Sequence, residues 1–130
     1  MIIDNILLDK LTVQAKESPR LRMNMDLRNS SADSSQRMLN AIEPGSVVPI
    51  HRHQKTSETV VVLRGRVVEE YYSSTGVLEA SYELAAGGPV FALNIPAGQW
   101  HTLRALESGT VILEMKDGAY EPIGECDILK

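Results

Sequence analysis

The chain has 130 residues, 43% of them hydrophobic, and a formal net charge of −4 from 13 basic and 17 acidic residues. Such a length fits one domain, residues 1–130, with a core that needs no disulfide, and the single Cys126 has no partner within the chain. Without a basic stripe we expect no nucleic-acid partner, and without an apolar run near ~20 residues we expect no membrane span.

The N-terminal segment, residues 1–17, is predicted to contain one helix over residues 3–16. Its apolar residues recur at a helical interval, at Ile3, Leu7, Leu11 and Ala15. Asp4 can cap the start of the helix, and Pro19 ends it. We expect the helix to cover a sheet edge or pack on a partner chain. Because this segment lacks the basic start of a signal peptide, a cytoplasmic protein is expected.

From residue 20 onward the hydrophobic period changes from helical spacing to alternation. Residues 20–27 predict a strand with one polar face, 29–35 a polar loop, and 36–42 a second strand. Further short strands are separated by turns that contain Gly or Pro, and they cover residues 59–63, 67–72, 77–84, 91–95, 100–106 and 110–116. Short strands at this regular spacing predict an all-β sandwich or barrel.

All three histidines of the chain fall into one pattern with a glutamate. His51 and His53 are two residues apart, Glu58 follows five residues later, and His101 begins another predicted strand. Imidazoles with one carboxylate suit one divalent transition metal ion, such as Fe, Mn, Zn, Ni or Co, and leave positions for water or substrate. Taken alone, a His-x-His pair more often belongs to a solvated strand end.

The spacing of these residues resembles the two motifs of the cupin superfamily. The first motif corresponds to Gly45-x5-His51-x-His53-x4-Glu58-x6-Gly65, and the second to Pro96-x-Gly98-x2-His101. Val90 and Ala105 stand where the second motif often has Gly and Asn, but neither position is a metal ligand in the family. The resemblance implies a cupin, a small antiparallel β-barrel or jelly roll, with His51, His53, Glu58 and His101 as metal ligands.

Longer segments resemble the WbuC family of cupin-fold metalloproteins. These are residues 18–24, 36–45, 95–102, 106–110 and 114–120, within a barrel expected from about residue 18 to 122. The resemblance implies a metal-binding cupin of a family often associated with O-antigen and other surface-polysaccharide gene clusters. Since cupins are often homodimers, it also implies a homodimer.

Polar side chains on the first two strands are candidates for binding a small molecule. They are Arg20, Arg22, Asn24, Gln36 and Asn40. If they line the barrel mouth, the arginines can clamp a phosphate or carboxylate, which favours an anionic ligand such as a sugar-nucleotide or an acidic sugar. The alternative is a solvent-facing edge strand or a dimer interface.

Glu114 and Lys116 alternate with an apolar row on the last predicted strand. Either side chain would be a catalytic acid or base candidate if it pointed into the barrel, whereas a solvated face is the structural alternative.

Three functions are compatible with the four-residue pattern and with what the family resemblance implies. The first is a metal-dependent enzyme acting on a sugar or sugar-nucleotide in surface-polysaccharide biosynthesis. The second is a non-catalytic module that binds a small ligand through the metal, and the third is an Fe(II) dioxygenase on a small organic substrate. The sequence leaves open which of them applies, and whether the protein is an enzyme.

Overall fold

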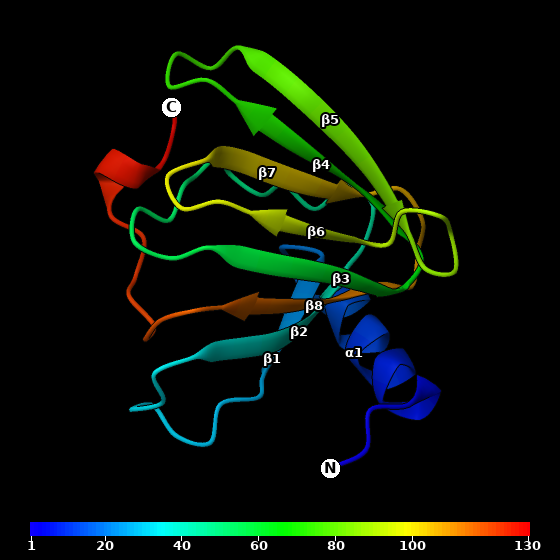
Figure 1. The fold of residues 1–130 in the computed structure, drawn as a ribbon. Coiled ribbons are helices and arrows are strands. Elements are labelled where there is room, and N and C mark those ends of the chain that lie inside the picture. The colour runs from blue at the N-terminus through cyan, green and yellow to red at the C-terminus, as the bar shows by residue number, and fades with distance from the viewer.

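The computed structural model describes residues 1–130 and consists of one α-helix, eight strands and a short 3₁₀-helix (Figure 1). The elements are α1 (Asn5–Glu17), β1 (Arg22–Asp26), β2 (Gln36–Ile42), β3 (Glu58–Arg64), β4 (Arg66–Tyr72), β5 (Leu78–Ala85), β6 (Ala92–Ile95), β7 (Trp100–Ala105), β8 (Thr110–Lys116) and η1 (Glu125–Asp127). The helix begins with the predicted cap, because the Asp4 carboxylate accepts a hydrogen bond from the Leu7 backbone N–H at 3.0 Å.

The strands form two antiparallel sheets, as the predicted barrel or jelly roll requires. One sheet has five strands in the order β1-β2-β8-β3-β6, and the other has three in the order β5-β4-β7. Their inner faces enclose an apolar core in one half of the barrel, made of Ile42, Val60, Val62, Val67, Leu84, Ile95, Leu103, Ala105 and Ile112. Fully burying side chains of this size contributes roughly 1.5–3 kcal/mol each, so this half holds the two sheets together.

Helix α1 packs on the outer face of β1, β2 and β8 rather than along a sheet edge (Figure 1). Leu8, Leu11 and Ala15 of the helix form a second buried cluster with Leu39, Ala41 and Val111 of the sheet. Met23 and Met25 of β1 pack against this cluster, so the alternate residues of β1 lie on the opposite face of the sheet, where Arg22 is partly buried and Asn24 and Asp26 are exposed. No helix of the structure combines the length and the apolar character needed to cross a bilayer.

Candidate metal centre

Three segments bring the histidines and Glu58 together at the end of the barrel away from the apolar core. Glu58 opens β3, and His101 is the second residue of β7. His51 lies in the extended segment before β3 and pairs with His101 through two backbone hydrogen bonds, of 3.0 and 2.8 Å. This pairing joins the segment that carries His51 and His53 to the strand that carries His101.

The side chains of these four residues converge. The imidazole ring centroids of His51 and His101 are 4.4 Å apart, and the His53 ring lies 5.1 Å from His51 and 5.8 Å from His101. One nitrogen atom from each of the three rings lies within 4.8 Å of the other two. Glu58 Oε2 lies 3.3 Å from His101 Nε2 and 3.5 Å from His53 Nε2. The arrangement therefore offers three imidazole nitrogens and one carboxylate oxygen around one point.

Backbone carbonyls orient two of the imidazoles. His51 Nδ1 lies 2.8 Å from the Pro49 carbonyl oxygen, and His101 Nδ1 lies 2.8 Å from that of Gln99. Because a carbonyl only accepts hydrogen bonds, Nδ1 must be the donor in both rings. Nε2 is then free of hydrogen in the neutral ring and available to a metal ion, and that of His101 lies 3.3 Å from Glu58 Oε2.

Protonation and unpaired polar atoms also fit a bound divalent ion. Burial, followed by the charge of His101, lowers the pKa of His51 to about 4, while burial and Lys116 lower that of His53 to about 4. Both rings are then neutral at pH 7, as metal ligands must be. His53 Nε2 and Glu58 Oε2 are buried without a hydrogen-bond partner, which is costly unless a ligand or ion supplies one. The donor set thus fits a divalent ion such as Fe, Mn, Zn, Ni or Co.

The two proposed catalytic candidates, Glu114 and Lys116, lie on the face of β8 that points toward the metal centre. Glu114 is buried and accepts a hydrogen bond from Asn40 Nδ2 at 3.5 Å, so the solvated alternative for Glu114 is wrong. Burial, followed by the charge of Glu58, raises the pKa of Glu114 to about 7. Lys116, on the same face of β8, is half-buried and lies opposite Glu58 in the strand register. A catalytic role of Glu114 or Lys116 stays a prediction.

Glu69 of β4 is a buried glutamate that the sequence reasoning missed. Its side chain is 0% exposed, and neither carboxylate oxygen has a hydrogen-bond partner. Glu69 lies opposite Leu103 of β7, and Tyr71, two residues further along β4, lies opposite His101. The face of β4 that carries Glu69 therefore continues toward the metal centre. Burial, followed by the charges of Glu58 and Glu114, raises the pKa of Glu69 well above its usual value.

Four of the five residues proposed to bind a ligand share one face of β1 and β2, with Asn24 opposite Asn40, but the five do not line one cavity. Arg20 is exposed and precedes β1, because the chain bends at Leu21, whose φ is 55°. Arg22 lies on the inner face, but its Nη1 donates to the Val47 carbonyl at 2.8 Å. Asn24 is exposed, and Asn40 is buried beside Glu114. A ligand-binding role of these residues stays a prediction.

A cavity of about 430 Å³ adjoins the centre at His53. Among the candidates only Gln36 lines it, and its amide also lies 3.4 Å from the Ala119 carbonyl. The other side chains that line it are mostly polar and include Lys55, Asp117, Glu121 and Asp127. Such a lining suits a ligand with several hydrogen-bonding groups, and the C-terminal tail after β8 forms one of its walls.

The raised pKa of Glu114 predicts how stability depends on pH in metal-free protein. Since its pKa is above the unfolded value of about 4.5, the stability that the protonated form contributes is lost as pH rises from 4.5 to 7. The Glu114→Gln side chain keeps the same shape but cannot ionise, so the variant should not lose this stability. The free energy of unfolding of the variant, relative to that of wild type, should therefore increase by up to roughly 3 kcal/mol as pH rises over this range. Urea unfolding at pH 5, 6, 7 and 8 in EDTA measures the difference. Glu79→Gln, an exposed control, should show none, and a pH-independent difference for Glu114→Gln would contradict the expectation.

The fold is similar to that of several proteins of known structure. KdgF from Halomonas sp. is 15% identical over 80% of this chain and 84% of its own, with a TM-score of 0.62. The capsular polysaccharide assembling protein CapF from Staphylococcus aureus is 18% identical over 86% of this chain but only 32% of its own, with a TM-score of 0.68. BH2720 from Bacillus halodurans is 20% identical over 95% and 85%, with a TM-score of 0.62.

At such identities the likeness shows the fold, which in these neighbours is the cupin fold. A search of curated proteins finds no match. A family model described as "Domain of unknown function (DUF6016)" matches residues 3–84, which is more than half of the chain. The chain therefore has the cupin fold and belongs to the DUF6016 family.

Proposed function

We propose that the protein is a metal-dependent cupin of the WbuC type that acts on a sugar or sugar-nucleotide of surface-polysaccharide biosynthesis. The observation that carries the proposal is the convergence of His51, His53, Glu58 and His101, with two of their polar atoms buried and unpaired. The polar cavity beside His53 supports a ligand rich in hydroxyl groups. The likeness to CapF, whose description names capsular polysaccharide assembly, agrees with this class of substrate.

In this proposal different residues of the chain bind the metal, transfer a proton and orient the ligand. His51, His53, Glu58 and His101 would hold a divalent ion, which when bound supplies a Lewis acid for a ligand carbonyl or hydroxyl. Glu114, whose burial and neighbour Glu58 raise its pKa to about 7 when no ion is bound, would be the group that holds or releases a proton. Side chains of the cavity, among them Gln36 and Lys55, would orient hydroxyls or an anionic group of the ligand.

The test begins with elemental analysis of protein purified without a metal-affinity step. We expect close to one divalent ion per chain, and about none in Glu58→Gln, which keeps the side-chain shape but removes the charge. Glucose, glucuronate and UDP-glucose are then titrated into metal-loaded and EDTA-treated protein by calorimetry. Binding of at least one of them should require the metal.

Two outcomes would contradict the proposal. Protein that neither retains a metal nor takes one up on addition of Zn²⁺, Mn²⁺ or Fe²⁺ has no metal centre. Protein that holds iron, binds none of the sugars and consumes oxygen with a small organic acid would instead favour the dioxygenase.

A further inference from the structure

The C-terminal tail runs alongside the segment that carries His51 and His53. The Arg52 backbone N–H donates to the Asp127 carbonyl at 3.0 Å, and the Leu129 N–H donates to the Ile50 carbonyl at 2.8 Å. His51 and Ile128 form an isolated β-bridge. In Figure 1 the tail, drawn in red with η1, returns to the end of the barrel where β7 begins. The tail thus acts as an extra strand beside the histidine segment.

The Asp127 side chain binds the two residues that flank His53. Its Oδ1 accepts hydrogen bonds from Arg52 Nε at 2.9 Å and from Gln54 Nε2 at 2.6 Å. Arg52 and Gln54 directly precede and follow His53, and all three line the cavity together with Asp127. With side-chain exposures of 31% for Arg52 and 18% for Asp127, the pair is partly shielded from water. A charge-assisted bond in this setting is stronger than one on an open surface.

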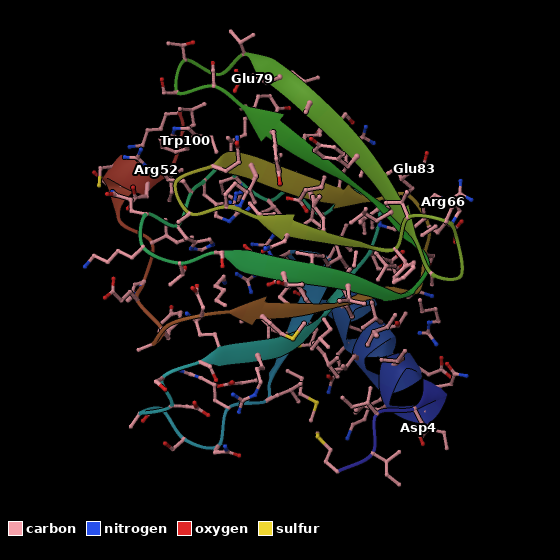
Figure 2. The ribbon with its side chains drawn as sticks, viewed as in Figure 1. Asp4, Arg52, Arg66, Glu79, Glu83 and Trp100 are labelled. Carbon is pink, nitrogen blue, oxygen red and sulfur yellow. The ribbon has the colours of Figure 1, made fainter.

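Arg52 also connects the tail to the strand of the third histidine. Its guanidinium carbon lies 4.6 Å from the centroid of the Trp100 ring, and Trp100 directly precedes His101. Figure 2 shows the two labelled side chains near one another beside the C-terminal 3₁₀-helix. A cation over an aromatic face contributes about 0.5–1 kcal/mol or more. One guanidinium therefore links the segments of all three histidines to Asp127.

Few other contacts fix the histidine segment, which lies outside the strand ladders apart from the pairing at His51. His53 itself is held through its carbonyl, which accepts from the Gly98 N–H at 2.7 Å. We propose that Asp127 is a positioning residue of the metal centre, which holds His51 and His53 in place through Arg52 and Gln54. This inference rests on the proposed metal binding and makes the C-terminal tail part of the site.

The test measures Zn²⁺ affinity by competition with a chromophoric chelator at pH 7 and 20 °C, where all variants must be folded by circular dichroism. Asp127→Ala should bind Zn²⁺ about 10–100-fold more weakly than wild type, the range found when partners of metal ligands are removed. Glu125→Ala is the matched control, because it removes the same charge from an exposed position of the same 3₁₀-helix. Its affinity should stay within about twofold of wild type.

A double-mutant cycle separates positioning from general weakening of the fold. If Asp127 acts through Arg52, the loss in Arg52→Ala/Asp127→Ala should be clearly smaller than the product of the two single losses. A loss in the double variant equal to the product of the two single losses would overturn the inference. So would a loss in Glu125→Ala as large as that in Asp127→Ala. So would wild-type affinity in Asp127→Ala, an outcome that leaves the proposed metal binding intact. Wild-type protein that binds no Zn²⁺, Mn²⁺ or Fe²⁺ would overturn both.

Discussion

Replacing His101 with alanine is expected to lower metal affinity by at least about 100-fold and to leave no metal in purified protein. His101 is the central member of the cluster, since its ring neighbours that of His51 and its Nε2 lies 3.3 Å from Glu58 Oε2. It is 2% exposed, so its imidazole meets the other donors inside the barrel. Elemental analysis and titration of Zn²⁺ into metal-free protein measure the loss.

The fold should survive this substitution. Trp100, Leu103 and Ala105 keep β7 packed, and the backbone pairing of residue 101 with His51 does not need the side chain. Arg104→Ala, exposed on the same strand, is the control for alanine in β7 and should keep its metal. A folded His101→Ala protein with wild-type metal content would show that the histidines serve another purpose.

The convergence of the four proposed ligands could be predicted from the sequence because they lie at strand ends whose spacing follows a fixed motif. His51, His53 and Glu58 flank one short loop, and His101 follows the Pro96-x-Gly98 turn. Turn residues and alternation fix where such side chains point. The all-β fold was predictable for the same reason, since each strand ends at a local signal.

The buried position of Glu69 could not be predicted, because β4 reads Val-Val-Glu-Glu-Tyr-Tyr from Val67 to Tyr72. Both faces of such a strand carry one Val, one Glu and one Tyr, so alternation cannot tell which face is inside. Packing of β4 against the other sheet decides it. The link between Arg52 and Asp127 was equally inaccessible, because the two residues are 75 positions apart and share no local pattern.

On β1 the sequence predicted the face of Arg22 but not its contacts. The polar face that holds Arg22 looked suited to bind an anion, and the structure does turn it inward, because helix α1 takes the methionine face. There, however, the guanidinium donates hydrogen bonds to the Val47 carbonyl and to Ser46 Oγ. Alternation predicts the face of a side chain but not the partners that it meets there.

Alanine at Gly65 is expected to destabilise the fold by about 3 kcal/mol or more, whereas alanine at Gly87 should cost about 1–2 kcal/mol. Both glycines have positive φ, 85° and 72°, so both substitutions carry the strain of a left-handed backbone. Only at Gly65 would the new Cβ meet a neighbour, lying 2.8 Å from Thr110 Cα as well as against the Thr110 hydroxyl, while nothing lies within 4 Å at Gly87.

Thr110 cannot move aside to make room. It is 0% exposed, begins β8, and its hydroxyl lies 2.7 Å from the Glu107 carbonyl. Alanine at Gly65 must therefore push the β3–β4 turn away from β8, on the sheet that presents Glu58. Urea unfolding of both variants in EDTA measures the difference, and a Gly65→Ala chain that does not fold at all agrees with it. Equal losses of stability in the two variants would mean that left-handed backbone geometry, not the close approach to Thr110, is what requires glycine at the end of this motif.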